Sequence, residues 1–457
     1  MAGQIHESWS SRSAFLMAAV GSAVGLGNIW RFPFIAGENG GGSFVLVYLI
    51  CIAAVGLPVL IAELSIGRRG GLSTIGSTRE VAIQEGRSRG WQIIGWMAIA
   101  APILGLLFYS TVAGWAFAYI FETAAGVFKG ISPEGSGKVL AALHADPLQM
   151  AGWHFLFMAA TVVIVAKGIR GGLEKAINWM MPLLFLLLLI LVAYAAWAGD
   201  FRRGVAFLFN PDFARLTPQA ILIAMGQAFF TLSLGGGGMM TYGAYLPKGI
   251  SLPRTGVVIV AADTLVAILA GLAIFPLVFA YGLTPAGGPG LIFVTLPIAF
   301  GQMPLGTLFG TLFFVLLAVA ALTSSISMLE PVVSYLEEHK GFKRARMALI
   351  SGLVIWVAGL GSVLSFNIWA EFYPLSFFPL FAKARVFDIL NYVTANIFMT
   401  LGSLLVAVFV GWLMSRATSV AEFGMGDGPA YRLWRFLIRY VGPLAVGIIF
   451  IFGITSL

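Results

Sequence analysis

The feature that most constrains this chain is the repetition of apolar runs, each long enough to cross a lipid bilayer. A helix of about 20 apolar residues spans the hydrocarbon core. Only 10% of the 457 residues are charged, whereas soluble proteins carry about a quarter charged residues. The sequence therefore predicts an all-α integral membrane protein with eleven transmembrane helices. The runs lie near 14–36, 43–66, 91–123, 152–168, 176–198, 218–246, 255–282, 304–336, 347–365, 387–415 and 433–456.

Basic residues alternate between the two sides of these runs. Alternate loops, with the N-terminal segment, hold 19 of the 27 Lys and Arg, and the opposite loops hold 7. The positive-inside rule then places the N-terminus in the cytoplasm, and an odd number of helices places Leu457 outside. The net charge of +8 thus reflects orientation in a bilayer, and no basic polar domain is available for nucleic acid. The start of the chain is too polar for a secretory signal, so we expect the first helix to be retained.

The first apolar run is interrupted by residues that disfavour a continuous helix. Its stretch Gly21–Pro33 contains three glycines, a proline and the polar residues Asn28 and Arg31. Lipid offers no partner for freed backbone groups, so such a break needs protein or a water-filled cavity around it. An ionisable residue at this depth indicates a functional site. Close helix packing is the alternative, and it accounts for Gly21 and Gly25 but poorly for Asn28 and Arg31.

The sixth run repeats this anomaly. Gly226–Gly238 ends in four consecutive glycines, and each glycine costs a helix interior about 1 kcal/mol relative to alanine. Two interrupted segments five helices apart indicate an inverted-repeat transporter that holds ligand and ions at the midplane. We expect a first repeat over 1–200, a second over 201–416 and an additional helix over 417–457. The long, uncharged loop at 283–303 is expected to form an outer lid.

These stretches resemble the neurotransmitter:sodium symporter family and its bacterial leucine transporter. The similarity runs from about Trp9 to Trp412 and includes Gly21–Pro33, Tyr109–Trp115, Gly226–Gly235 and Ala320–Ser325. The resemblance implies a 5+5 inverted-repeat fold with broken first and sixth helices. It also implies sodium-driven uptake of an amino acid or amine by alternating access, in the inner (plasma) membrane of a bacterium. No obligate protein partner is evident.

The resemblance implies two sodium sites. The first falls on Ala23, Asn28 and Thr231 and on Asp263, where the register leaves one residue of slack. The second falls on the backbone carbonyls of Gly21, Val24 and Ala320 and on the side-chain hydroxyls of Thr323 and Ser324. Oxygen atoms without sulfur or imidazole suit a hard cation. Without the resemblance, the hydroxyls are better interpreted as bonding to carbonyls one turn earlier.

The resemblance also implies a substrate pocket. The substrate carboxylate is expected at the N–H groups near Leu26 and Gly27, at a half-helix N-terminus, and at the Tyr109 hydroxyl. Gly105 and Gly236 replace bulky residues of small-substrate members, so we expect a roomy pocket for a neutral, large hydrophobic or aromatic L-amino acid; filling of that room by Phe230 or Trp30 is the alternative. The full set of expected substrate contacts is Ser22, Ala23, Leu26, Gly27, Gly105, Tyr109, Phe230, Thr231, Ser233, Gly236, Ser324 and Met328.

Asp263 lies in the middle of an apolar run. Animal members of the family use chloride beside the first sodium, and bacterial members usually place a fixed acid nearby. The resemblance therefore implies chloride-independent transport with Asp263 as that acid. The alternative is an acid that pairs with another buried group.

The gates depart from the family pattern. The outer gate pairs Arg31 with an acid in the family, but Asn391 stands at that position here. A charge-assisted hydrogen bond to Asn391 would replace the salt bridge, and compensation by Asp388, one turn away, is the alternative. The inner gate has His6 in place of an arginine, opposite Glu338, and Tyr245 matches the tyrosine that braces the inner network.

Three classes of function remain open. A sodium symporter is favoured. A proton-coupled or exchanging carrier of the same fold would need a titrating group at the second sodium site, and Thr323 and Ser324 do not titrate. A membrane enzyme would need clustered catalytic side chains, but the four histidines are scattered. A channel is the remaining alternative, but a channel usually builds its pore by symmetry from a shorter chain, whereas both broken segments lie in one polypeptide here.

Overall fold

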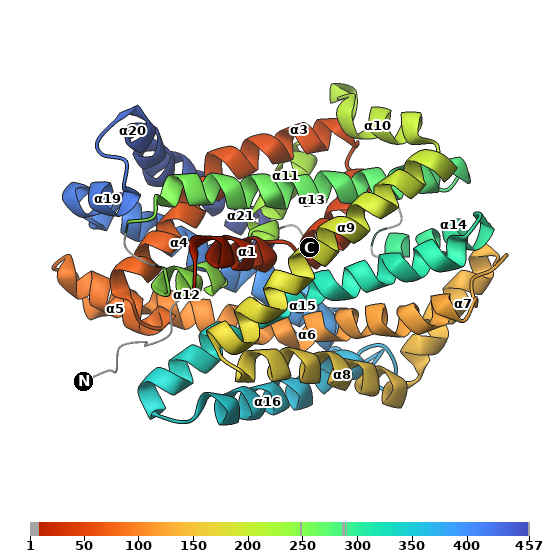
Figure 1. The fold of residues 1–457 in the computed structure, drawn as a ribbon, viewed down its shortest axis with the longest axis horizontal. Helices are drawn as coiled ribbons and strands as arrows, with labels where there is room; N and C mark the ends of the chain where they lie inside the picture. The colour runs from red at the N-terminus through yellow and green to blue at the C-terminus, as the bar shows by residue number, and fades with distance from the viewer. Residues whose placement is uncertain (1–8, 247–248, 286–287, 289, 456–457) are drawn as a thin grey trace.

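The computed structural model describes residues 9–246, 249–285, 288 and 290–455, and all regular structure in these ranges is helical (Figure 1). The first half of the chain contains α1 (Arg12–Ala23), α2 (Phe32–Glu38), α3 (Gly42–Cys51), α4 (Leu57–Gly70), α5 (Thr74–Gln84), α6 (Ile93–Ala124), α7 (Pro133–Ala145), α8 (Pro147–Ala166), α9 (Lys175–Ala198) and α10 (Phe201–Phe209). The second half contains α11 (Pro218–Thr231), α12 (Gly238–Ala244), α13 (Leu252–Ala280), α14 (Leu296–Gln302), α15 (Gly306–Lys340), α16 (Arg344–Leu364), α17 (Val386–Tyr392), α18 (Thr400–Val408), α19 (Arg416–Phe423), α20 (Pro429–Phe436) and α21 (Gly442–Thr455).

Several of these helices join through wider π-helical or tighter 3-10 turns into longer rods. The π-helical turns are Gly27–Arg31, Ile52–Gly56, Ile169–Glu174, Leu291–Thr295, Val393–Met399, Phe409–Leu413 and Leu437–Val441, and the 3-10 turns are Arg89–Gln92, Phe213–Arg215 and Pro379–Phe381. In the described ranges, nine rods are long and apolar enough to cross a membrane, and α1 with the segment Gly27–Glu38 adds a bent tenth. The predicted sixth span is α11 followed by α12, with residues 232–237 between them.

Local sequence explains where the helices begin. Asp146 accepts hydrogen bonds from the backbone N–H groups of Leu148 and Gln149 at 3.0 and 2.9 Å, and Pro147 opens α8. Thr217 caps α11 in the same way, ahead of Pro218. A side-chain oxygen at the cap satisfies a free N–H, and proline has no N–H to leave unsatisfied.

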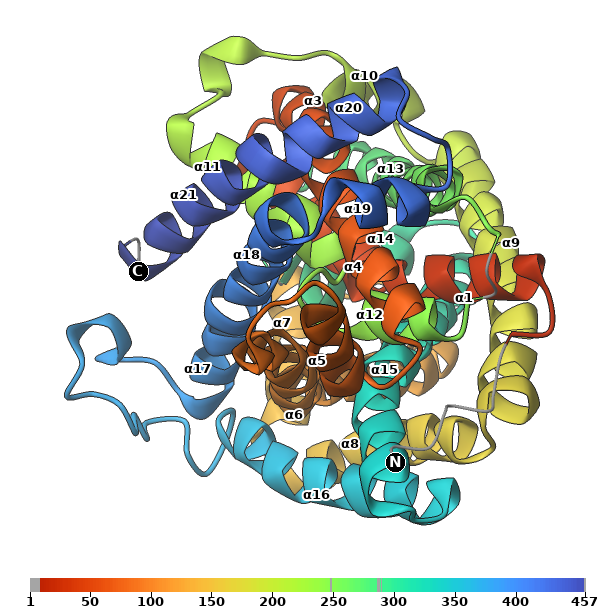
Figure 2. The same ribbon diagram turned by 90° about the vertical axis from the view of Figure 1, so that its left-hand side faces the viewer.

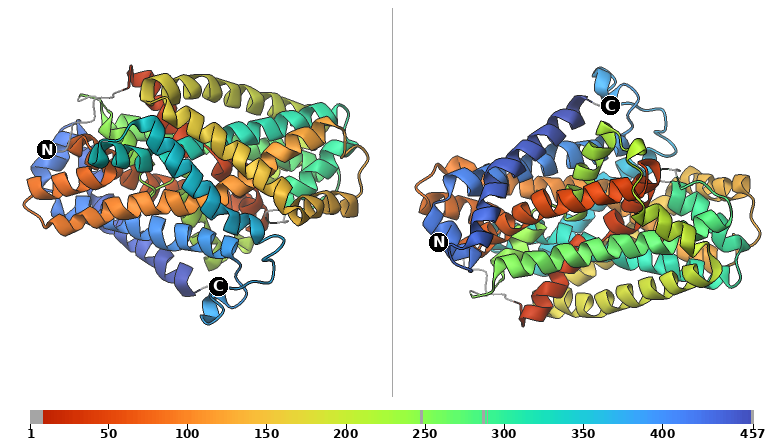
Figure 3. Two further views of the ribbon diagram at one scale, coloured as in Figure 1. Left: turned by 90° about the horizontal axis from the view of Figure 1, so that it is seen from below. Right: turned by 90° about the horizontal axis from the view of Figure 1, so that it is seen from above.

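The rods form a bundle in which central helices are enclosed by peripheral ones. Figure 2 looks along the bundle and shows α4, α12 and α15 near the middle, with α8, α9, α16 and α21 around them. Of the apolar window in α15, 78% of the residues are buried, compared with 22% in the rod formed by α20 and α21. That last rod lies at the edge of the molecule in both views of Figure 3. Helix α15 is thus the most buried rod, and it contributes to the central cavity described below.

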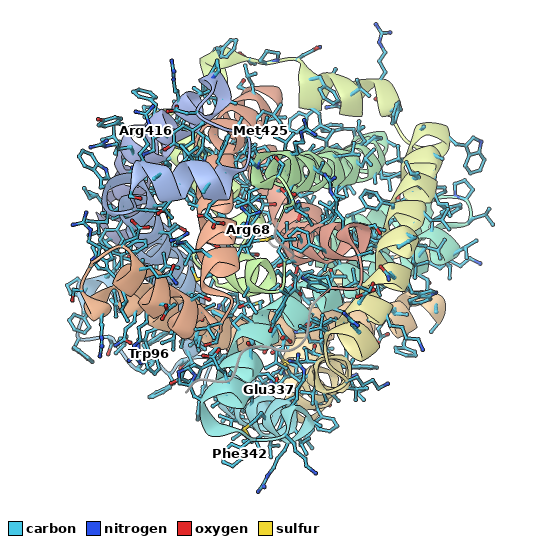
Figure 4. The ribbon with its side chains drawn as sticks, turned by 60° about the vertical axis from the view of Figure 1, so that its left-hand side comes forward. Arg68, Trp96, Glu337, Phe342, Arg416 and Met425 are labelled. Carbon is cyan, nitrogen blue, oxygen red and sulfur yellow. The ribbon has the colours of Figure 1, made fainter. Side chains whose placement is uncertain are left out.

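The two ends of the bundle differ. The left-hand end in Figure 1 carries α5, α19 and α20, and the opposite end carries α7, α10 and α14. Figure 4 is turned toward the first end and labels Arg68, Glu337 and Arg416 there. This end, which we call the basic end, collects the loops in which most Lys and Arg occur. The predicted lid loop lies at the other end and contains α14, and the carbonyl of Pro285 approaches Gly37 of α2 so closely that a Cβ on Gly37 would lie 2.2 Å away.

Candidate substrate and ion site

The two broken segments meet in the centre of the bundle. Helix α1 ends at Ala23, and Val24 leaves the helix with φ −72° and ψ 118°. The second segment is unwound between α11 and α12. The side-chain amide of Gln227 in α11 donates to the carbonyl of Gly27 at 2.8 Å, which ties one break to the other. Backbone groups freed by both breaks therefore lie against protein, as a break at membrane depth requires.

The glycines of the second break are required by their backbone. Gly235 and Gly237 have φ of +75° and +73°, which is costly for any residue with a Cβ. A Cβ on Gly235 would lie 2.1 Å from the carbonyl oxygen of Met399, and one on Gly237 would lie 2.4 Å from that of Ala98. Gly236 is different, because an added Cβ would meet only the Ser233 backbone, with its oxygen at 3.0 Å. Gly236 is therefore less constrained than Gly235 and Gly237.

A cavity lies between the breaks, with an empty volume of about 650 Å³ that includes its opening. All twelve residues predicted as substrate contacts line it. The structure adds eight lining residues that sequence reasoning missed: Gly25, Ala101, Pro102, Phe108, Gly238, Ser327, Thr394 and Met399. Several of them belong to apolar stretches without any motif, so only the three-dimensional contacts identify them.

The wall near Gly105 corrects one expectation. A Cβ added to Gly105 would lie 2.6 Å from the terminal methyl of Met328, so Met328 already fills the space that the missing side chain leaves. The room expected at Gly105 is therefore partly occupied, whereas at Gly236 no side chain lies within 4 Å of an added Cβ. Tyr109 stands on the same helix as Gly105, and its hydroxyl donates weakly to the carbonyl of Ala321 at 3.4 Å.

The predicted first-sodium side chains form one buried polar cluster. The amide nitrogen of Asn28 donates to a carboxylate oxygen of Asp263 at 2.7 Å and to the Thr231 hydroxyl oxygen at 2.9 Å. The Thr231 hydroxyl in turn lies 3.1 Å from both carboxylate oxygens of Asp263. The other end of the Asn28 side chain accepts from the Gly25 N–H at 3.0 Å. One asparagine thus joins the unwound backbone to the buried acid, and Ala23 lines the adjoining cavity.

The predicted second-sodium residues also lie together. The hydroxyls of Thr323 and Ser324 donate to the carbonyl oxygen of Val24 at 3.2 and 3.3 Å, although they lie about 300 positions further along the chain. Thr323 also bonds back to the carbonyl of Ala320 at 2.9 Å, as expected from the alternative interpretation. A Cβ on Gly21 would lie 3.6 Å from the Thr323 Cβ, so Gly21 adjoins the same group.

A second, larger cavity lies beside the first on the side away from the basic end, with an empty volume of about 1490 Å³ including open solvent. We call it the outer cavity. Four residues line both cavities and so separate them: Leu26, Phe108, Tyr109 and Phe230. Trp30 lines only the outer cavity, so it does not fill the inner one.

The predicted outer-gate residues share this outer cavity without pairing. Arg31, Asp388 and Asn391 all line it. The Arg31 guanidinium lies 4.0 Å from the centre of the Phe230 ring, whereas Asp388 forms an ion pair with Arg385 at 3.0 Å. Asp388 therefore does not substitute for the missing gate acid in this conformation, because another arginine holds it.

His144, on α7, lies at the outer cavity between two aromatic rings. Its ring centre is 4.5 Å from that of Trp115 and 4.7 Å from that of Phe366. Burial and the nearby positive charge of Arg385 lower the pKa of His144 to about 4. The imidazole is therefore neutral at pH 7.

The basic end of the site is sealed by a network that the sequence indicated only in part. The Tyr245 hydroxyl donates to Glu330 at 2.9 Å and to Ser334 at 3.1 Å, and Glu330 also pairs with Arg344. Glu338 accepts from the backbone N–H of Ser73 at 2.5 Å, and its predicted partner His6 lies outside the described residues.

Trp9 completes this seal. Its indole is buried and lies edge-on to Tyr242, with ring centres 5.3 Å apart.

Glu63 is a further residue that sequence reasoning missed. It is fully buried in α4, and one carboxylate oxygen accepts from the backbone N–H of Gly235 at 2.6 Å. The bond satisfies a donor that the second break leaves without a helical partner. The two residues are separated by 172 positions, so no local pattern could have revealed the contact.

Comparison with known proteins agrees with this geometry. Residues 6–128 and 144–457 match the model of the Sodium:neurotransmitter symporter family. The uncharacterized sodium-dependent transporter YhdH of Bacillus subtilis (strain 168) is 40% identical over 453 residues, which is 98% of each chain. An uncharacterized sodium-dependent transporter of Haemophilus influenzae is 33% identical over 97% of each chain.

A solved structure shares the fold. The crystal structure of MhsT in complex with L-phenylalanine superposes with a TM-score of 0.89 at 41% identity, and the match covers 98% of this chain and 99% of that one. The predicted leucine-transporter-type fold is thereby confirmed. On the family match and these relatives, the chain belongs to the sodium:neurotransmitter symporter family.

Proposed function

We propose that this chain is a sodium-coupled symporter that imports a neutral, hydrophobic L-amino acid by alternating access and without chloride. Family membership supplies the sodium dependence and the membrane location. The contacts of the central cavity support the further details of ions and substrate. The proposed setting is the inner membrane of a bacterium, with the N-terminus in the cytoplasm, the basic end inside, and repeats over 1–200 and 201–416.

The observation that carries the proposal is a buried carboxylate without a counter-ion. Asp263 is fully buried, and its side-chain partners within the described ranges are the neutral groups of Asn28, Thr231 and Tyr48. An unpaired buried charge is strongly unfavourable. A sodium ion among these oxygens would neutralise it with the hard, oxygen-rich surroundings that such ions prefer. We place the first sodium in this cluster, with Ala23, Asn28 and Thr231, and Asp263 in or beside its shell.

A second sodium is proposed between the broken first helix and α15. The carbonyls of Gly21, Val24 and Ala320 and the hydroxyls of Thr323 and Ser324 supply the oxygens. The present bonds from both hydroxyls to Val24 support this assignment, because they bring neutral oxygens from distant helices to one point. A cation there would couple the first helix to α15.

The lining of the central cavity supports the substrate class. Of its twenty described lining residues none is charged, and the far wall is formed by groups such as Pro102, Met328 and Met399. The carboxylate of the substrate is placed at the N–H groups of Leu26 and Gly27, and the ammonium at nearby carbonyls. A charged substrate side chain would have no partner, and each buried methylene of an apolar one contributes about 0.8 kcal/mol. The L-phenylalanine bound in MhsT is consistent with this class.

Chloride independence is tested with Asp263→Asn. We expect uptake by the unmodified protein to be equal in sodium gluconate and sodium chloride, because Asp263 supplies the fixed negative charge. The variant should lose uptake in gluconate and recover part of it in chloride. Ser327→Ala is the matched control, since Ser327 lines the same cavity but bonds only to its own helix, at the Ser324 carbonyl.

The outcomes of this experiment also distinguish the proposed sodium symporter from a proton-coupled carrier. A strict chloride requirement in the unmodified protein contradicts the role of Asp263. Uptake driven equally well by a proton gradient without sodium would instead support the proton-coupled carrier.

A further inference from the structure

A cluster at the basic end has no role in the central site. It consists of Arg439 with the aromatic residues Trp412 and Tyr440, and we call it the Arg439 platform. The guanidinium lies 4.3 Å from the Trp412 ring centre and 5.6 Å from that of Tyr440. The indole N–H of Trp412 donates to the backbone carbonyl of Arg439 at 2.8 Å. The hydrogen bond holds Trp412 beside Arg439, and the guanidinium lies against both rings.

The platform faces the surroundings of the protein and not its interior. Trp412 is 49% exposed and Tyr440 is 48% exposed, and the neighbouring Leu433 and Phe436 are also exposed. All but Trp412 belong to the rod of α20 and α21, which lies at the edge of the bundle (Figure 3). Exposed tryptophan and tyrosine on a membrane-spanning rod are typical of the boundary between hydrocarbon and headgroups.

Arg439 lacks an acidic partner. None of the described carboxylates lies within ion-pair distance of it. Its Nε atom is buried, so the two terminal nitrogens are the ones available to a ligand. A cation at this depth is costly unless it meets an anion or reaches the headgroups. The planar guanidinium matches a phosphate with two parallel hydrogen bonds.

The surroundings add more positive than negative charge. Arg435, one turn before Arg439, is held by the backbone carbonyls of Val410 and Met414 at 2.8 and 3.1 Å. Arg416, labelled in Figure 4, and Arg432 share the single carboxylate of Asp427 at 2.6 and 3.7 Å. A headgroup that carries its own cation is disfavoured in such surroundings, whereas a net negative one is favoured.

We propose that the Arg439 platform binds the phosphate of an anionic phospholipid from the leaflet at the basic end. Trp412 and Tyr440 frame the headgroup, and Leu444 and Ile448, which are exposed further along the same rod and away from the basic end, adjoin the start of the acyl chains. The proposal does not depend on the transported substrate. The proposed orientation is needed only to identify this leaflet as the cytoplasmic one.

Native mass spectrometry of delipidated protein, titrated with phosphatidylglycerol and separately with phosphatidylcholine, tests the proposal. The unmodified protein should bind phosphatidylglycerol more tightly, and Arg439→Gln should weaken that binding about fivefold, the effect of roughly one basic residue near a membrane surface. Phosphatidylcholine binding should not change. Arg432→Gln is the matched control, because it removes the same charge from the same rod, two turns from Arg439 and beside Asp427, and it should change binding less than twofold.

Two further arms keep the test decisive. Trp412→Leu retains the charge but removes part of the frame, so it should also weaken phosphatidylglycerol binding, and it replaces Arg439→Gln if that variant fails to fold. Inorganic phosphate at equal concentration should not displace the lipid. Equal affinity for the two lipids, unchanged binding in Arg439→Gln and Trp412→Leu, or displacement by inorganic phosphate would each overturn the proposal.

Discussion

At the scale of single residues, Asn28 links the unwound first segment to the buried polar cluster of the proposed first sodium site. Its amide nitrogen now stands among oxygens of Asp263 and Thr231, at 2.7 and 2.9 Å. A small cation would take the place of this N–H group, because the partly positive N–H already lies between a carboxylate and a hydroxyl. Rotation of the amide would turn its oxygen toward such an ion while Asp263 and Thr231 kept their places.

A second residue-scale consequence concerns acid. The folded protein holds His144 neutral with a pKa of about 4, whereas the unfolded chain gains a proton near pH 6.5. Between these values the unfolded state binds more protons, so stability falls as the pH is lowered from about 6.5 toward 4. We predict that His144→Gln flattens this part of the profile of apparent melting temperature against pH.

His339 offers the matched control for this profile. It is partly exposed at the basic end, with Nδ1 3.7 Å from Glu338. His339→Gln controls for the replacement of a histidine by glutamine away from the outer cavity. An identical slope in His144→Gln would show that His144 does not cause it.

At the scale of elements, the unwound segment between α11 and α12 depends on backbone geometry. Its positive φ angles and close carbonyl contacts require glycine at 235 and 237 but not at 236. Glu63 adds a bond from α4 to the Gly235 N–H. The break is therefore a defined structure and not a loosened helix.

This difference within one glycine run gives a direct prediction. Gly235→Ala should cost at least about 1–2 kcal/mol from the left-handed backbone alone, and its clash with the Met399 carbonyl should abolish substrate binding. Gly236→Ala should destabilise the protein less than Gly235→Ala and reduce affinity mainly for the largest substrates, because Gly236 lines the cavity and its Cβ would meet only the Ser233 backbone, at 3.0 Å. Competition binding and melting temperature measure both variants. Equal losses in the two would contradict this difference between Gly235 and Gly236.

The elements also show what the sequence could and could not reveal. Hydropathy identified the spans, because about 20 apolar residues are a local signal, and the glycine runs marked both breaks. The bond from Glu63 to Gly235 and the pair of Arg344 with Glu330 were missed, since neither partner signals the other locally. The room expected at Gly105 was overestimated because Met328, distant in sequence, fills it.

At the scale of the whole molecule, the two ends of the transport path are in different states. The outer cavity opens above Phe230, whereas Trp9, Tyr242 and Tyr245 close the basic end. Alternating access requires these two barriers to exchange. The Tyr245 hydroxyl is bonded to Glu330 and Ser334 in this arrangement, in which the barrier at the basic end is closed.

Tyr245→Phe should therefore favour opening toward the basic end. We predict faster labelling of a cysteine placed at Ser22, in a Cys51→Ala background, by a reagent applied from that side. Tyr431→Phe is the matched control, because Tyr431 is also buried at the basic end but bonds to Ser419 at 2.7 Å, away from the transport path. Unchanged labelling in Tyr245→Phe would exclude this network as part of the barrier.

The central claim is that sodium at the two oxygen-lined sites makes the cavity competent for a hydrophobic amino acid. Its most direct test is equilibrium binding of L-phenylalanine, L-leucine and glycine to purified protein in sodium chloride and in potassium chloride. We predict tight binding of the two large substrates in sodium only and weaker binding of glycine. The double variant of Thr323→Ala and Ser324→Ala should weaken binding in sodium tenfold or more, about 1.4 kcal/mol. Equally tight binding in sodium and potassium would contradict the account.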